Sequence, residues 1–164
     1  MKQLLLIRHA KSSWDDPSQN DFDRPLNKRG KKDAPEMAER LLDKKIKIDA
    51  FLSSPAERAL DTCIYFTKAF DVKKKEIIQI PELYNAQVEN FYKVVSEVDN
   101  SFDTIALFSH NPGITEFVNE LTDVHIDDMP TCSIFAVKAD IKNWEEFTEG
   151  EKLFWFYDYP KLKE

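Results

Sequence analysis

The sequence predicts an α/β sandwich, in which helices pack on a mostly parallel sheet of about six strands. Short apolar runs alternate along the chain with amphipathic stretches, a pattern typical of this class. Several of the runs are apolar at successive positions, as in strands that are covered on both faces. No repeat, low-complexity tract or Ser/Gly-rich linker divides the 164 residues, so we expect a single domain over residues 1–164.

Each expected strand is a short apolar run. The run at the start of the chain, Leu4 to Ile7, is the most continuous, and we expect a strand over residues 3–7. The other runs predict strands at residues 49–52, 77–83, 104–108, 133–137 and 153–157.

Three amphipathic stretches predict helices, because their apolar residues recur at helical spacing. Pro35 lies in the first stretch and either starts or kinks that helix. A fourth helix is predicted after residue 53 by a start signal, with Ser54 as the N-cap, Pro55 in the first position and Glu57 completing a capping box. The three stripes are 34/37/38/41/42, 91/94/95/98 and 114/117/118/121.

Composition and charge narrow the function classes. The formal net charge of −7 argues against nucleic acid as the default partner. No apolar run is long enough to cross a membrane, and the apolar start is too short for a signal peptide. The two cysteines, Cys63 and Cys132, lack the spacing of a metal site. We therefore expect a reduced, cytoplasmic protein that contacts neither membrane nor nucleic acid.

Chemically versatile residues follow the predicted strands. The first strand runs into Arg8 and His9, the second into a block containing Arg58, the third into Glu82 and the fourth into His110. In a parallel sheet these strand ends meet at one edge, where function usually lies. Arginine forks match the oxygens of a phosphoryl group, and helix N-termini after the second and fourth strands add N–H donors.

A neutral imidazole can accept a phosphoryl group as a nucleophile, so this edge predicts phosphoryl transfer through histidine, without a metal. Each residue taken alone also fits a structural role. Arg58, for example, could pair with Glu57 or Asp61 on its own helix. The convergence of these residues on one edge favours the catalytic interpretation.

Four sequence blocks resemble the histidine phosphatase superfamily in the same order along the chain. The first reads LLLIRHAKSSW and resembles, in particular, the SixA-type phosphohistidine phosphatases. The second contains DRPL followed by RG, the third reads SSPAERALDT, and the fourth reads FSHNPG. These blocks occupy residues 4–14, 23–30, 53–62 and 108–113, within a similar stretch from about residue 2 to residue 121.

The resemblance implies a phosphoglycerate-mutase-like fold, a three-layer α/β/α sandwich around a mostly parallel, mixed sheet. It also implies that His9 is the nucleophile and carries the phosphoryl group transiently, while Arg8, Arg58 and His110 form the phosphate pocket. No metal or organic cofactor is implied. The implied substrate is a phosphohistidine-bearing protein or a small phosphomonoester. A non-catalytic phosphoprotein-binding module is the alternative from another class.

Two further residues are candidates for binding substrate. Arg24 matches a position of the SixA-type subgroup that contacts substrate, and its alternative role is a loop arginine paired with Asp21 or Asp23. Asn111 follows His110 and precedes a proline, so we expect it at the start of a helix beside the phosphate pocket.

The general acid is left open by the sequence. Glu82 follows the third strand, Asp21 and Asp23 are weaker candidates, and the reaction could proceed without a carboxylic acid. Phosphohistidine leaves as an imidazole, which needs less protonation than an alkoxide. Only 20 residues separate Leu83 from Thr104, too few for an obvious lid. An open site favours a phosphorylated side chain on another protein.

Overall fold

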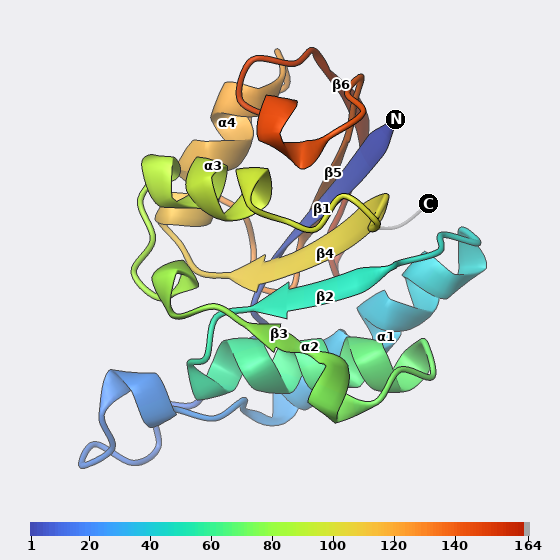
Figure 1. Cartoon of the computed structure of the whole chain (residues 1–164). Helices are drawn as coiled ribbons and strands as arrows, with labels where there is room; N and C mark the ends of the chain where they lie inside the picture. The colour runs from blue at the N-terminus through green and yellow to red at the C-terminus, as the bar shows by residue number, and fades with distance from the viewer. Residues whose placement is uncertain (163–164) are drawn as a thin grey trace.

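A computed structural model describes residues 1–162, and it has three layers. In Figure 1 the helices α3 (Val88–Ser96) and α4 (Gly113–Leu121) lie above the sheet, while α1 (Lys28–Asp43) and α2 (Glu57–Ala69) lie below it. The sheet is built from β1 (Lys2–Arg8), β2 (Ala50–Ser53), β3 (Ile78–Gln79), β4 (Thr104–Ser109), β5 (Ile134–Ala139) and β6 (Lys152–Asp158).

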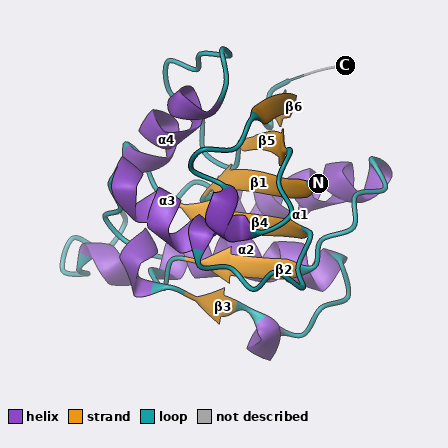
Figure 2. Cartoon of the chain, turned by 45° about the horizontal axis from the view of Figure 1, so that its top comes forward, coloured by secondary structure: helices purple, strands orange, loops and turns teal. Residues whose placement is uncertain are grey.

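The strand order is β3-β2-β4-β1-β5-β6, which is visible as a stack in Figure 2. The first four strands of the chain run parallel. On one side of the sheet β5 pairs antiparallel with β1, and β6 pairs antiparallel with β5. The carboxyl ends of β1, β2 and β4 therefore share one edge. The predicted three-layer sandwich around a mostly parallel, mixed sheet is confirmed.

Alternation along β1 divides the apolar core into two. Leu4 and Leu6 face one core, with α3 and α4, whereas Leu5 and Ile7 face the other, with α1 and α2. All four side chains are buried. Burial of such a side chain contributes about 1.5–3 kcal/mol, so both helical layers hold the same strand in place.

Five of the six predicted strands agree with the structure to within a residue or two at their ends. The third, predicted over residues 77–83, is too long, because β3 contains only Ile78 and Gln79. A 3₁₀ turn, η3 (Pro81–Leu83), follows at once. Pro81 has no backbone N–H to donate to a neighbouring strand, which explains why the strand stops before it. Residues 163–164 of the predicted domain lie outside the described residues.

Two helix starts differ from the prediction. Helix α2 begins at Glu57 with Ala56 at the N-cap, so the predicted Ser54 cap is wrong. Helix α4 begins at Gly113 after Pro112, and Asn111 does not cap it. Elsewhere, α1 starts after Asn27, whose side chain accepts a hydrogen bond from Gly30 N at 2.9 Å. That helix continues through Pro35, which therefore does not start it.

Gly30, in the first turn of α1, packs closely against the segment that follows β1. A Cβ at this position would overlap the Lys11 backbone carbonyl oxygen and crowd the Lys11 nitrogen at 3.1 Å. Backbone atoms cannot move aside as a flexible side chain can. The close approach therefore places α1 directly against the segment that carries the residues after Arg8.

We predict that Gly30→Ala lowers the free energy of unfolding by about 1–3 kcal/mol, because the added methyl overlaps backbone. In an unobstructed helix the same change raises stability by up to about 1 kcal/mol. Urea denaturation of the variant measures the sign. Lys32→Ala, at an exposed position of the same helix, serves as the control and is expected to stay within about 0.5 kcal/mol of wild type.

Candidate active site

The register of β1 against β4 brings the two candidate histidines together. Arg8 pairs with Ser109, so the next residues of the two strands, His9 and His110, leave the sheet side by side. His9 N donates to Ser109 O at 3.1 Å, and the ring centroids of the histidines lie 5.1 Å apart. Both rings are buried.

The His9 ring is oriented by its own backbone. Its Nδ1 lies 2.7 Å from Ala10 O, and a carbonyl can only accept, so Nδ1 carries the proton. Ala10 is held in turn by α2, because its N–H donates to Thr62 Oγ1 at 2.9 Å. In the neutral ring, Nε2 then has a free lone pair.

Burial is the main reason that the pKa of His9 lies well below its ordinary value. The neighbouring His110 and the arginines Arg58 and Arg8 lower it further, while the hydrogen bond to Ala10 O opposes them. The ring is therefore neutral near pH 7, as a nucleophile must be.

His110 is also held neutral, and its ring has a fixed orientation. Burial, followed by the charge of Arg58, lowers its pKa to about 3. Nε2 lies 2.7 Å from Ser54 Oγ, and that oxygen accepts the N–H of Ala56 at 3.2 Å. The Ser54 proton is thus available to Nε2, and we assign the ring proton to Nδ1. Ser54 Oγ thus binds the N–H of Ala56, which precedes α2, and does not cap that helix.

The two candidate arginines are anchored by their outer nitrogens. Arg8 Nη1 donates to Met129 O at 2.7 Å, and Arg58 Nη1 donates to Asp21 O at 2.6 Å. The Nε atoms of Arg8 and Arg58 and the Nδ1 atom of His110 are buried, with no hydrogen-bond partner among residues 1–162. All three residues lie close enough to His9 to lower its pKa, and unpartnered N–H groups are donors that suit phosphoryl oxygens.

Arg24 lies in the same network and is buried. Its Nη1 donates to Ser12 Oγ at 2.7 Å, and its Nη2 lies 3.2 Å from Asp21 Oδ1. The guanidinium also stacks on the exposed Trp14, with its central carbon 3.5 Å from the ring centroid. The pairing with Asp21 that the sequence suggested for Arg24 is thus present in the structure.

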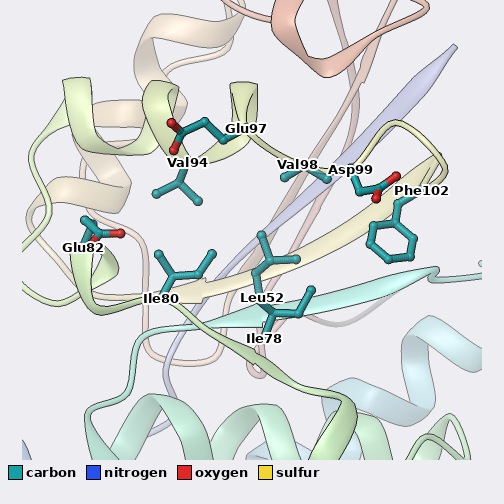
Figure 3. Close-up of a pocket in the computed structure, with 9 residues that line it drawn as sticks. All are labelled: Leu52, Ile78, Ile80, Glu82, Val94, Glu97, Val98, Asp99 and Phe102. Atoms are coloured by element: carbon teal, nitrogen blue, oxygen red, sulfur yellow. The ribbon is translucent and has the colours of Figure 1, made fainter.

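Glu82 is the first candidate that the sequence offered for a general acid. It is exposed and lines a groove with residues of β2, β3 and α3, and none of Arg8, His9, Arg58 and His110 lines that groove. Figure 3 shows Glu82 at one end of the groove, whose lining also includes Val94 and Glu97. Asp23, the other weak acid candidate, is exposed in the turn η1 (Asp21–Asp23).

Asn111 has a role in holding a loop. Its Nδ2 donates to Asp128 Oδ1 at 2.7 Å and to Met129 O at 3.1 Å, while its Oδ1 accepts the Thr115 hydroxyl at 2.6 Å. Because Met129 O also accepts Arg8 Nη1, Asn111 supports Arg8 through the loop.

Sequence reasoning missed two residues of the site. Tyr84 packs its ring edge-on against His110, with centroids 5.6 Å apart, and its hydroxyl donates to Asp21 Oδ2 at 2.7 Å. Its position shortly after the third strand was the available signal. The acceptor role of Met129 O had no signal, because any residue supplies a backbone carbonyl.

Within residues 1–162, no group of three or more His, Cys, Asp or Glu side chains lies together as a metal would require. In the same part of the chain, no helix has the length and apolarity needed to span a membrane.

Comparison with known proteins agrees with this geometry. Residues 4–98 match the family described as Histidine phosphatase superfamily (branch 1). An uncharacterized chloroplastic protein of Arabidopsis thaliana is 31% identical over 153 residues, which cover 88% of this chain and 70% of that protein.

Solved structures match over nearly the whole chain. The protein histidine phosphatase SixA complexed with tungstate gives a TM-score of 0.81 at 25% identity, covering 96% of this chain and 97% of that one. A protein assigned as the SixA phosphohistidine phosphatase of Agrobacterium tumefaciens gives 0.81 at 24%, covering 97% and 98%. A mycobacterial glucosyl-3-phosphoglycerate phosphatase complexed with VO3 shares the fold at a TM-score of 0.74 and 13% identity, covering 97% and 100%.

The family match extends over more than half of the chain, and the matched residues include Arg8, His9 and Arg58. The relative with 31% identity supports the same assignment over a longer stretch. This chain belongs to the histidine phosphatase superfamily, and its sequence blocks and fold are of the SixA type.

Proposed function

We propose that this phosphatase removes the phosphoryl group from phosphohistidine on a partner protein, through a covalent phosphohistidine at His9. The observation that carries the proposal is the arrangement around His9. Its Nδ1 is bound to Ala10 O, which leaves Nε2 free. Arg8, Arg58 and His110 lie close enough to lower the pKa of His9, and each carries a buried N–H group with no partner among residues 1–162. A nucleophile with fixed donors beside it suits in-line phosphoryl transfer.

Two displacements at phosphorus make up the proposed reaction. His9 Nε2 forms a bond to phosphorus as the bond to the substrate nitrogen breaks, and the departing imidazole keeps the electron pair. Water then forms a bond to phosphorus as the bond to His9 breaks, which releases phosphate and restores the neutral ring. Arg8, Arg58 and His110 hold the phosphoryl oxygens through both displacements, where charge stabilisation is the main contribution.

The ionisation of the pocket supports a phosphohistidine substrate over an alkyl ester. Asp21 is the carboxylate in contact with Arg58; burial favours its neutral form, but hydrogen bonds from Tyr84 and Arg58 outweigh burial and lower its pKa to about 2. His110 is neutral as well. An alkoxide leaving group needs a protonated acid, whereas an imidazole can already be protonated on its other nitrogen.

The place of α3 supports a protein substrate. This helix takes nine residues of the segment between η3 and β4 and buries Phe91, Val94 and Val95 against the sheet. It therefore belongs to the helical layer of the fold, so these nine residues are not available to enclose a small substrate. A phosphorylated side chain of another protein can approach such an open site.

A small phosphomonoester is the second candidate, favoured by a cavity beside His110. The cavity has a volume of about 460 Å³ and is lined by the N-terminal turns of α3 and α4, including Glu89 and Glu116. It adjoins the proposed phosphate pocket and is large enough for the organic part of a small metabolite.

We predict that the protein hydrolyses a phosphohistidine-bearing protein in the presence of EDTA, and that His9→Ala abolishes turnover because the nucleophile is lost. Release of inorganic phosphate gives the rate. His125→Ala is the matched control, since His125 is an exposed histidine bonded to Asp127, and it should leave the rate unchanged. Binding of the phosphoprotein without turnover would support a non-catalytic module instead.

We predict that Glu82→Gln changes the hydrolysis of phosphohistidine and of p-nitrophenyl phosphate by less than about twofold, because Glu82 lines a different groove. Steady-state rates on both substrates and on an alkyl phosphate measure this. A collapse of alkyl phosphate hydrolysis alone would identify Glu82 as a general acid and would favour the phosphomonoester function.

We predict that the His9 and His110 rings stay neutral from about pH 8 to about pH 5, because burial opposes their protonation. Proton NMR titration of the ring signals, with His9→Gln and His110→Gln for assignment, tests this directly.

The same depressed pKa values have a consequence for stability. Histidines of the unfolded chain take up protons near pH 6.5, so the unfolded state gains more protons below that pH. The free energy of unfolding should therefore fall as the pH drops from about 6.5 toward the lowered pKa of His110, about 3. Ring signals that titrate near pH 6.5 would contradict the prediction.

A further inference from the structure

The Asp21 carboxylate contacts three side chains from three separate segments. Oδ2 accepts the Tyr84 hydroxyl at 2.7 Å and Arg58 Nη2 at 3.0 Å, and Oδ1 accepts Arg24 Nη2 at 3.2 Å. The Asp21 backbone carbonyl also accepts Arg58 Nη1. One residue of a short turn thus joins α2, the segment after η3 and the segment after η1.

The partners of Asp21 are more buried than Asp21 itself. The side chains of Arg58 and Arg24 are 7% and 8% exposed, whereas that of Asp21 is 48% exposed. Removing a guanidinium from water is costly unless acceptors and an opposite charge compensate. For Arg58, Asp21 supplies every hydrogen bond that its guanidinium makes to residues 1–162.

The contacts also determine which edge of the Arg58 guanidinium is used. Asp21 accepts from Nη1 through its backbone carbonyl and from Nη2 through its carboxylate. Both terminal nitrogens of the Arg58 guanidinium are therefore bound to Asp21. The Nε atom is left without a partner among the described residues. A planar fork held at its end by two acceptors cannot rotate freely, so its Nε–H keeps one direction.

We propose that Asp21 is a positioning residue, whose carboxylate orients Arg58 so that its Nε–H faces the phosphoryl group and fixes Tyr84 as a wall beside His110. The inference rests on the proposed function only in taking a phosphoryl group as the ligand. Asp21 acts through its partners and does not touch the substrate. The same contacts keep it ionised, since its pKa is about 2, so it has no proton to donate near neutral pH.

The test compares Asp21→Asn with Asp23→Asn. Asp23 is a matched control, because it is an aspartate of the same turn whose side chain makes no hydrogen bond or ion pair with residues 1–162. Isothermal titration with sodium tungstate measures binding of a phosphate-like anion without turnover. We expect Asp21→Asn to raise the Kd for tungstate about tenfold and Asp23→Asn to change it less than about twofold.

Tyr84→Phe provides a second variant that keeps the ring beside His110. It removes one hydrogen bond to Asp21, and we expect a smaller rise in the Kd for tungstate, about threefold. In the Asp21→Asn background the same change should add almost nothing, because the partner of the hydroxyl is already altered. Asp21→Glu, which retains the charge, should recover part of the binding.

The alternative is that Asp21 only offsets positive charge. Its removal would then strengthen the attraction for an anion, and a lower Kd for tungstate in Asp21→Asn would overturn the proposal. Equal losses in Asp21→Asn and Asp23→Asn would overturn it as well, since they would indicate a general effect on the turn. Wild-type protein that binds tungstate but hydrolyses no phosphohistidine would contradict the proposed function alone.

Discussion

The parallel pairing of β1 with β4 is the constraint on which the rest of the site depends. The register that sets Arg8 opposite Ser109 also sets His9 beside His110, because both chains leave the sheet at the same level. A shift of one residue would send the side chains of β1 to the opposite cores. Leu5 and Ile7 on one face and Leu4 and Leu6 on the other therefore fix the position of His9 through packing.

Burial at this edge decides which groups carry charge. The histidines lose their positive charge because each is desolvated and each faces Arg8 and Arg58. The arginines stay charged, because a guanidinium is far more basic than an imidazole. The charged guanidinium groups of Arg8 and Arg58 therefore lie beside a neutral His9 ring, on a protein whose formal net charge is −7. An anionic ligand and the uncharged ring proposed as the nucleophile can thus occupy the same small space.

Much of this edge could be predicted from the sequence, because its residues directly follow strands that are apolar on both faces. Arg8, His9 and His110 needed only the strand ends and the parallel order of the sheet. Side-chain partners could not be predicted in the same way. The Ser54 hydroxyl fitted a helix cap locally, but the His110 ring, 56 residues away in the chain, provides the partner at Nε2. Tertiary contacts outweighed the local signal.

The role of Asp21 was beyond the sequence for a different reason. The segment from residue 11 to residue 27 has no apolar period, so nothing in it predicts its path across the molecule. Only that path brings Asp21 to Arg58, 37 positions further along the chain. Glu82 is the opposite case. It follows β3, as the sequence predicted, but its side chain lines a groove with residues of β3 and α3. Position along the chain indicated which edge a residue approaches, but not its side-chain contacts.

The state of the carboxylate connects the geometry to the choice of substrate. A carboxylate that accepts hydrogen bonds from two arginines and a tyrosine is a counterion, and it cannot also be a proton donor. A pocket organised in this way favours substrates whose leaving group departs without enzymatic protonation. Phosphohistidine meets that condition because its imidazole has a second nitrogen for the proton. The ion pairs that hold Arg58 and Arg24 therefore agree with the proposed cleavage of a nitrogen–phosphorus bond.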